Sequence, residues 1–277
     1  MLQVKPNFPL TDVLLRLIGA LDQVAKQLKI SYFVIGATAR DILMEHVYEL
    51  ESARATRDVD FAVAVSSWGE FDRLKAQLIA TAGFFPGEHA HRLTFGEGVG
   101  AYPLDLVPFD GVEQGGEIAW PPKGEFVMNV SGYVEAFHSA LDVEIAPGFK
   151  AKVVSLPAMA ILKILAWNDR PEGDKHASDV LLILRNYHQA GQFDRLYAEC
   201  MDLLEAHGYD VELSGAALLG RDAQRDITQE TRDQVIAVFA NQKNFEKFNS
   251  QMMKSHTGDV ERTTLLLNGF LQELNRH

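Results

Sequence analysis

The stretch TRDVDF, residues 56–61, predicts a strand whose two faces differ in chemistry. Alternate residues of a strand face the same side, so Asp58 and Asp60 point together, while Val59 and Phe61 point into a core. Two neighbouring carboxylates repel each other unless a cation lies between them. Mg²⁺ suits this position because it prefers oxygen ligands and often bridges to substrate phosphates. The alternative is a solvent-exposed strand edge that happens to carry two aspartates.

Two neighbouring stretches favour the metal interpretation. Upstream, VIGATARD at residues 34–41 predicts a strand that passes through a small-residue turn into a helix, where backbone N–H groups can hold phosphate. Downstream, LDLVPF at residues 104–109 places Asp105 alone in an apolar strand, and a buried carboxylate without a partner is costly. If the two aspartate strands are neighbours, three carboxylates converge. Such a site suits two divalent ions and in-line attack on a nucleotide phosphorus.

The remaining periodicity predicts a mixed α/β first half and a helical second half, with domains at residues 1–155 and 156–277. Pro157 suits the first turn of the helix that begins the second half. The segment 110–125 is rich in Gly and Pro and is expected to be a loop. Strands are expected at 32–35, 58–65, 91–95, 102–109, 142–145 and 150–154, and helices at 11–30, 37–50, 67–82, 158–167, 175–187, 193–206, 229–240 and 259–274.

Composition narrows the class of protein. The 277 residues are 47% hydrophobic and 23% charged, which is typical of a folded protein. The net charge of −12 disfavours a surface that grips long nucleic acid by its phosphates. The one cysteine, Cys200, rules out an intramolecular disulfide and a cysteine-only zinc site. With no apolar run of about 18 residues and no signal-peptide pattern, we expect a cytoplasmic protein that does not bind membranes.

These motifs carry a family resemblance. Gly36-Ala37, the DVDF stretch at 58–61 and LDL at 104–106 resemble the nucleotidyltransferase superfamily of the DNA polymerase beta type. GATARDIL at 36–43 is also similar to the head motif of tRNA CCA-adding enzymes. Over the whole chain, including AILKILAWNDR at 160–170 and KHASDVL at 175–181, the sequence looks closest to AbiEii-type nucleotidyltransferases, the toxin components of some abortive-infection and toxin–antitoxin systems. The resemblance implies an α+β fold: a small, palm-like mixed-sheet domain followed by a helical domain.

The resemblance also implies roles for individual residues. Asp58, Asp60 and Asp105 would form the catalytic and metal-binding set, with Mg²⁺ or Mn²⁺ as cofactor and an NTP as substrate. The residues that would bind the nucleotide are Gly36, Ala37, Thr38, Arg40, Lys163 and Lys175. Ala37 departs from the family pattern, which has a second Gly or a Ser there, and His176 and Val180 stand where Asp and Leu are usual.

For three of the basic residues, the sequence leaves a structural role open. Arg40, together with Asp41, could tie its helix to the sheet. Lys163 lies in an apolar helix, where a lysine can simply extend its charged head to water. Lys175 is four residues before Asp179, so the two could pair on one helix face.

The expected function is transfer of a nucleoside monophosphate from an NTP to a hydroxyl, with release of pyrophosphate. The acceptor is left open among a tRNA, a protein and a small molecule, and a cognate antitoxin is an expected partner. The alternative is a catalytically silent module that binds nucleotide or metal in a toxin–antitoxin or regulatory system. A two-metal phosphohydrolase is a weaker third reading, because the sequence has no His–Asp metal motif.

Overall fold

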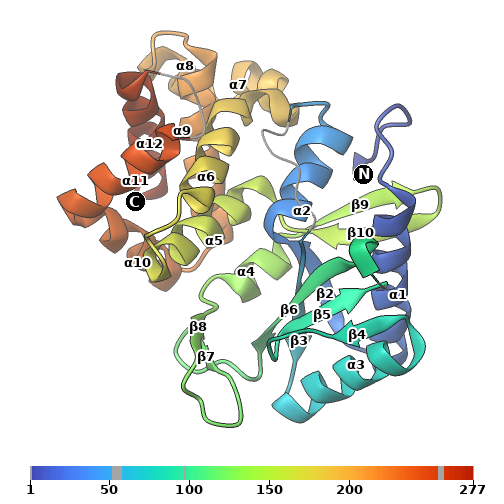
Figure 1. Cartoon of the computed structure of the whole chain (residues 1–277). Coiled ribbons are helices and arrows are strands. Elements are labelled where there is room, and N and C mark those ends of the chain that lie inside the picture. The colour runs from blue at the N-terminus through green and yellow to red at the C-terminus, as the bar shows by residue number, and fades with distance from the viewer. Residues whose placement is uncertain (1, 52–57, 97, 255–258, 277) are drawn as a thin grey trace. The chain divides into compact units, whose positions relative to one another are not determined.

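The computed structural model describes residues 2–51, 58–96, 98–254 and 259–276. Thr56 and Arg57 of the deciding stretch therefore lie outside the described residues. The chain forms two compact units, Met1–Val154 and Ser155–His277 (Figure 1). The first combines a mixed sheet with helices and the second is helical, so the predicted α+β class is confirmed. Within the described residues, no helix has the length and apolar character needed to cross a bilayer.

An eight-stranded mixed sheet organises the first unit, in the order β1-β9-β10-β2-β3-β6-β5-β4 (Figure 1). Its central strands run in mixed directions: β2 and β3 are antiparallel, β3 and β6 are parallel, and β6 and β5 are antiparallel. A separate two-stranded sheet pairs β7 with β8. The strands are β1 Leu2–Gln3, β2 Ser31–Ile35, β3 Val59–Val65, β4 Phe84–Pro86, β5 Arg92–Phe95, β6 Tyr102–Asp110, β7 Glu117–Ala119, β8 Val127–Asn129, β9 Leu141–Ala146 and β10 Phe149–Val153.

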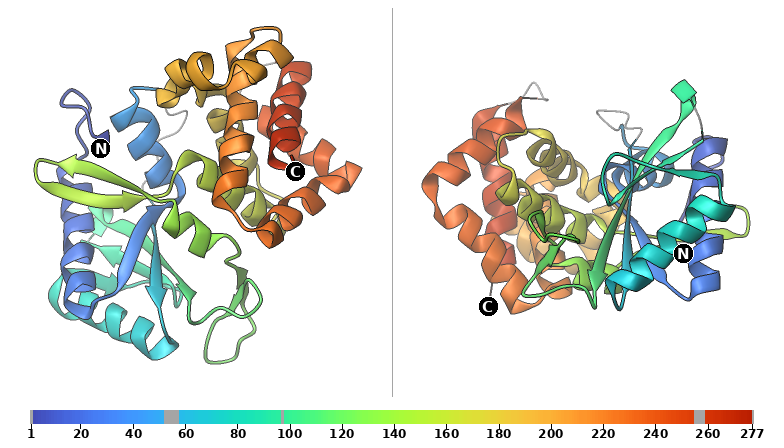
Figure 2. Two further views of the ribbon diagram at one scale, coloured as in Figure 1. Left: turned by 180° about the vertical axis from the view of Figure 1, so that it is seen from behind. Right: turned by 60° about the horizontal axis from the view of Figure 1, so that its bottom comes forward.

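The helices of the first unit begin where the sequence places caps. The Thr11 hydroxyl accepts from the Leu14 amide at the start of α1, and the Ser67 hydroxyl accepts from the Glu70 amide at the start of α3. Figure 2 shows α1 and α3 side by side. The helical elements are α1 Asp12–Leu28, α2 Gly36–Asp41, a π-helical turn Ile42–Val47, α3 Trp68–Thr81, a 3₁₀ turn Gly98–Gly100 and α4 Tyr133–His138.

The two faces of the central sheet are distinguished by their contacts. The Tyr32 hydroxyl donates to Asp22 of α1, which assigns Tyr32 to the face that carries α1. Phe33 lies on the opposite face, where its ring and that of Phe109 both contact Phe137 of α4. The strand register then places Asp60, which pairs with Ile35, on this α4 face.

The second unit is an array of helices with a buried centre. Ser155 caps α5 through the Ala158 amide and Pro157 lies in its first turn, as predicted. Trp167 of α5 is fully buried, and its Nε1 donates to Gln251 of α11. The helices are α5 Leu156–Asp169, α6 Lys175–Asn186, a π-helical turn His188–Gln192, α7 Phe193–Glu199, α8 Met201–Ala206, α9 Val211–Asp226, α10 Gln229–Ala240, α11 Gln242–Met253 and α12 Val260–Leu274.

The structure adds elements that the sequence pattern did not reveal. α9 and α11 are missing from the prediction, and the predicted helix 193–206 is broken at Cys200 into α7 and α8. α9 lacks a clear amphipathic stripe because it is buried on several sides, with small residues at the close contacts. A Cβ at Gly220 would lie 2.1 Å from the Phe270 carbonyl oxygen of α12, so only glycine allows this approach. In the first unit, β1, β4, β7, β8 and α4 were likewise not predicted.

Candidate functional site

Two of the predicted site residues, Asp60 and Asp105, lie side by side on the α4 face of the central sheet. The register pairs Asp60 of β3 with Asp105 of β6, on adjacent parallel strands. Because neighbouring strands lie about 4.8 Å apart, the two carboxylates start from adjacent positions on the same face. Asp58, two residues before Asp60, directly precedes β3 and is exposed. The two aspartate strands are thus neighbours, which is the condition that the sequence analysis set for the carboxylates to converge, and Asp58 lies just outside β3.

A fourth residue, Arg92, completes this row of charges. Antiparallel pairing places Arg92 of β5 directly opposite Asp105. Its Nε donates to Asp105 Oδ1 at 2.7 Å and its Nη2 donates to Oδ2 at 2.6 Å, a bidentate ion pair. These hydrogen bonds raise the pKa of Arg92 above its usual value, and the negative charges of Asp105, Asp58 and Asp60 add to the increase. All three carboxylates therefore act on one guanidinium.

Sequence reasoning missed Arg92, although a signal was present. The predicted strands 91–95 and 102–109 are separated only by the glycine-rich stretch 96–100, which is typical of a hairpin. Pairing that begins with Phe95 opposite Tyr102, as the structure has it, brings Arg92 opposite Asp105. His91 is half-buried: its Nε2 lies 4.0 Å from Asp105 Oδ1, and its ring packs against Trp120.

The absence of a side chain at Gly36 leaves space for the Asp60 side chain. Gly36 is the first residue of α2 and has a φ of +66°, a conformation that glycine adopts at no steric cost. A Cβ at this position would lie 2.0 Å from Asp60 Oδ2, 2.8 Å from Cγ and 2.9 Å from Cβ. The whole Asp60 side chain therefore packs over the glycine turn. The turn and the aspartate strand form one unit.

We expect Gly36→Ala to destabilise the protein by about 1–3 kcal/mol more than Gly148→Ala, measured by urea unfolding. Both glycines have a positive φ, 66° and 74°, so both substitutions impose backbone strain. A Cβ at Gly148 meets nothing within 4 Å, whereas one at Gly36 displaces Asp60. Equal losses in the two variants would contradict the close packing of Asp60 on Gly36.

The other residues of the glycine turn have structural contacts. The Thr38 hydroxyl donates to the backbone oxygen of Asp58 at 3.0 Å, which ties α2 to the start of β3. Arg40 is 2% exposed, and its Nε and Nη2 donate to Asp41 Oδ1 at 2.9 and 2.6 Å. Ala37 is half-buried. Contact of any of these residues with nucleotide stays a prediction.

The donor chemistry of the carboxylate group suits a divalent cation. Its members present only oxygen ligands, the type that Mg²⁺ and Mn²⁺ prefer. They already surround a positive charge, that of Arg92. In the part of the chain that the structure describes, no three His, Cys, Asp or Glu side chains are grouped to hold a metal ion, and both oxygens of Asp105 bind Arg92 instead. The three aspartates thus suit a divalent cation in charge and donor type, while in this structure Asp105 binds the Arg92 guanidinium.

The second unit carries its own charged group, which contains Lys163. Lys163 of α5 donates from Nζ to Asp179 Oδ2 of α6 at 2.5 Å, with side chains 12% and 5% exposed. Asp179 therefore has a partner on another helix, whereas the pairing considered in sequence was with Lys175, which is exposed. Arg170, Lys175 and His176 lie close enough for their charges to interact. Asp169, Glu172 and Asp174 belong to the same stretch of sequence, so residues 163–179 carry three permanent cations and four carboxylates.

His176 is the residue of this group that sequence reasoning did not select. Burial, followed by the positive charge of Lys163, lowers the pKa of His176 to about 4. The negative charge of Asp179 offsets only part of this decrease. The Nδ1 of His176 is buried and has no hydrogen-bond partner in the described residues. The imidazole is consequently neutral at pH 7.

We expect His176 to make the protein less stable as the pH falls. The folded-state pKa of about 4 lies below the ordinary value of 6.5, so between these values the unfolded chain binds the extra proton. The free energy of unfolding should decrease by about 1–2 kcal/mol from pH 7 to pH 5 through this residue. Urea unfolding of wild type and His176→Gln measures it, since the variant lacks this part of the slope. Identical pH dependence in both proteins would show that His176 titrates normally.

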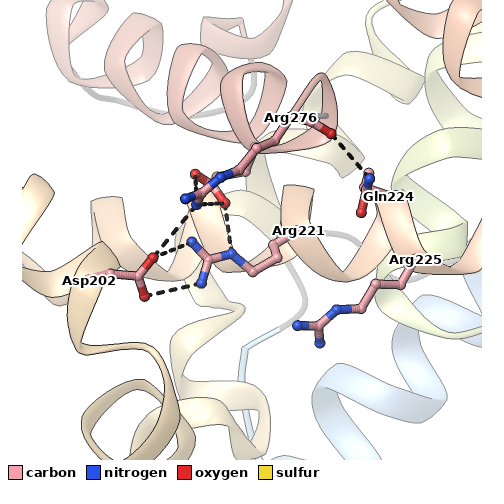
Figure 3. Close-up of a pocket in the computed structure, with 6 residues that line it drawn as sticks. Asp202, Arg221, Gln224, Arg225 and Arg276 are labelled. Atoms are coloured by element: carbon pink, nitrogen blue, oxygen red, sulfur yellow. Dashed lines mark hydrogen bonds and ion pairs between the residues drawn. The ribbon is translucent and has the colours of Figure 1, made fainter.

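A pocket elsewhere on the second unit is an ion-pair network. It has a volume of about 330 Å³ and is lined by Asp202, Arg221, Gln224, Arg225, Glu273 and Arg276. Figure 3 shows Arg221 and Arg276 both reaching Asp202. Arg221 also donates to Glu273 at 2.7 Å. These pairs join α8, α9, α12 and Arg276 beyond the end of α12, so we assign the network a structural role.

The geometry can now be compared with known proteins. Residues 20–261 match the family model described as nucleotidyl transferase AbiEii toxin, type IV TA system. No protein with a curated description matches the chain. The match includes all of Gly36, Asp58, Asp60, Asp105, Lys163 and Lys175.

Solved structures also show similarity. The antibiotic-resistance factor ANT(2'')-Ia is 17% identical, with a TM-score of 0.38 over 72% of this chain and 99% of that one. A nucleotidyltransferase-like protein from Paracoccidioides brasiliensis is 16% identical, with a TM-score of 0.43 over 72% and 93% of the two chains. The lincosamide adenylyltransferase LnuA is 19% identical, with a TM-score of 0.35 over 55% and 84%. The family match covers most of the chain, and on that ground the protein belongs to the AbiEii nucleotidyl transferase family.

Proposed function

We propose that this protein transfers a nucleoside monophosphate from an NTP to a hydroxyl acceptor and releases pyrophosphate, with Mg²⁺ or Mn²⁺ as cofactor. The observation that carries the proposal is the pairing of Asp60 and Asp105 on one sheet face, with Asp60 packed over Gly36 and Asp58 directly before β3. Family membership supports nucleotidyl transfer in general. The transfer chemistry is assigned to residues 1–155, and the helical residues 156–277 contribute nucleotide contacts.

The proposed roles follow from the positions of the side chains. Asp58 and Asp60 would hold the metal, which when bound neutralises phosphate charge and orients the reacting groups. Asp105 accepts the proton of the acceptor hydroxyl on a carboxylate oxygen. The acceptor oxygen then forms a bond to the α-phosphorus, the bond from that phosphorus to the bridging oxygen of the β-phosphate breaks, and pyrophosphate leaves. Backbone amides at Gly36, Ala37 and Thr38 are assigned to the phosphates.

The basic residues of the second unit are assigned to phosphate binding. Lys163 and Lys175 are proposed to contact the triphosphate, with Arg170 as a further positive charge near them. Arg40 is proposed to act on the nucleotide indirectly, by holding α2 in position through its ion pair with Asp41.

The acceptor is proposed to be a tRNA, a protein or a small molecule, and a cognate antitoxin is the proposed partner. NTPs and Mg²⁺ are cellular solutes, so we place the reaction in the cytoplasm. One observation favours the silent binding module as the second candidate. Both carboxylate oxygens of Asp105 accept hydrogen bonds from Arg92, so Arg92 competes with a metal or a proton for each of them.

A transfer assay separates the two candidates. Each of the four NTPs, labelled at the α-phosphate, is incubated with Mg²⁺ and with total tRNA, total protein or a small-molecule extract. We expect label to enter one fraction with metal-dependent pyrophosphate release, and to be lost with Asp58→Ala/Asp60→Ala. Nucleotide binding in calorimetry without transfer would favour the silent module instead.

A further inference from the structure

Arg92 has an unusual position for a cation in this site. It lies on β5, one strand beyond Asp105, and its guanidinium takes both oxygens of that carboxylate. The Arg92 side chain is 35% exposed, whereas Asp105 is 18% exposed. The ion pair thus joins a half-buried carboxylate to a residue whose charged end has access to solvent.

The charges around Arg92 explain why a cation is needed there. Asp58, Asp60 and Asp105 all raise its pKa, which means that three negative charges act on one positive charge. Asp60 and Asp105 occupy paired positions on adjacent strands, where like charges destabilise a sheet. The guanidinium therefore offsets repulsion within the same carboxylates that are proposed to hold the metal.

We propose that Arg92 is an internal latch on Asp105 that competes with the divalent metal and then binds the nucleotide polyphosphate. In the metal-free protein, the guanidinium holds Asp105. A metal bound to the carboxylates would neutralise the charge of Asp105 in place of the guanidinium. The planar guanidinium would then be available to bind phosphate oxygens in the same bidentate way. This inference rests on the proposed function and makes Arg92 a positioning residue for Asp105.

The flexible arm of Arg92 makes such an exchange physically reasonable. Four side-chain torsions separate its guanidinium from the backbone, so the head can move while β5 remains paired with β6. The Arg92 backbone, by contrast, is held in place, because its carbonyl oxygen accepts from the Gly87 amide at 3.0 Å and β5 pairs with β6. The base of the side chain is thus fixed, while the side chain as a whole is 35% exposed.

The test measures Mn²⁺ binding to the full chain by electron paramagnetic resonance, without nucleotide. Arg92→Ala removes the competitor, so Mn²⁺ should bind on the order of 10- to 100-fold more tightly than to wild type. Arg92→Lys keeps the charge without the fork and should fall between the two. Arg92→Ala/Asp105→Asn should lose the gain. Arg73→Ala, which removes a surface arginine 61% exposed on α3, should match wild type.

A second measurement addresses the polyphosphate. With Mn²⁺ present at saturation, the Kd for a non-hydrolysable NTP analogue should increase on the order of tenfold in Arg92→Ala and less in Arg92→Lys. If Arg92→Ala is folded by circular dichroism and binds Mn²⁺ no more tightly than wild type, the latch is wrong. The latch is also wrong if neither protein binds Mn²⁺. If Arg92→Ala does not fold, Arg92→Lys replaces it, and Mn²⁺ binding no tighter than that of wild type overturns the latch. Transfer by the wild-type protein is measured separately, so a failed latch and a failed proposed function are distinguishable.

Discussion

Asp60→Asn is expected to lower kcat for nucleotidyl transfer by roughly 10³-fold and to leave the fold intact. Asp60 lies at the centre of the proposed site, since it pairs with Asp105 across the sheet and packs over Gly36. A metal held by such a group contributes several kcal/mol of charge stabilisation, and each 1.36 kcal/mol corresponds to about tenfold in rate. Loss of the negative charge removes most of that contribution.

The substitution separates chemistry from packing. Asparagine has nearly the volume of aspartate, so it still fits over Gly36. Removing one of three like charges also relieves repulsion, so the Tm should be unchanged or higher. The assay is single-substrate kinetics with a labelled NTP and Mg²⁺, accompanied by thermal unfolding. Asp142→Asn on β9, where the side chain is 64% exposed, is the matched control and should keep full activity. Activity of Asp60→Asn within tenfold of wild type would remove Asp60 from the catalytic set.

Asp179→Ala is expected to reduce the free energy of unfolding by about 3–5 kcal/mol, the usual cost when one partner of a buried ion pair is removed. The Lys163 side chain is 12% exposed and loses its 2.5 Å contact, so it is left charged in a poorly hydrated place. The positive charges of Arg170 and Lys175 nearby add to the cost. Urea unfolding, followed by circular dichroism of the helices, measures the change.

Two further variants show whether the loss comes from the unpaired charge. Lys163→Met/Asp179→Leu removes both charges and should recover most of the stability, because apolar replacement of a buried pair is often neutral. Asp233→Asn on the exposed side of α10 should change stability by no more than about 0.5 kcal/mol. A loss below about 1 kcal/mol in Asp179→Ala would show that Lys163 reaches water unaided.

The Lys163–Asp179 and Arg92–Asp105 ion pairs place two basic residues in different electrostatic surroundings. Lys163 was weighed in sequence between phosphate binding and a head extended to water, and the structure adds a third state, in which it pairs with Asp179. Phosphate binding by Lys163 would require its Nζ to exchange Asp179 for a phosphate oxygen. In the first unit, Arg92 and Asp105 form the corresponding pair among an excess of negative charge.

The sequence alone determined the features that depend on short-range geometry. Alternation along a strand predicted that Asp60 faces away from the core residues Val59 and Phe61, and the small-residue turn predicted a helix from residue 37, one residue after α2 begins. The hairpin at 142–154, the caps at Thr11 and Ser67, and Pro157 in the first turn of α5 follow from the same local rules. Each depends on the dihedral angles and hydrogen bonds of a few consecutive residues.

Only the tertiary structure decided which side chains became partners. Asp105 met Arg92 because the register of β5 on β6 set the pairing, and Asp179 met Lys163 because α5 packs against α6. α9 was invisible to periodicity because burial on several sides removes the amphipathic stripe that marks a surface helix. A charged or buried residue takes its partner from whatever segment packs against it, and that choice depends on contacts between distant parts of the chain, which no local pattern specifies.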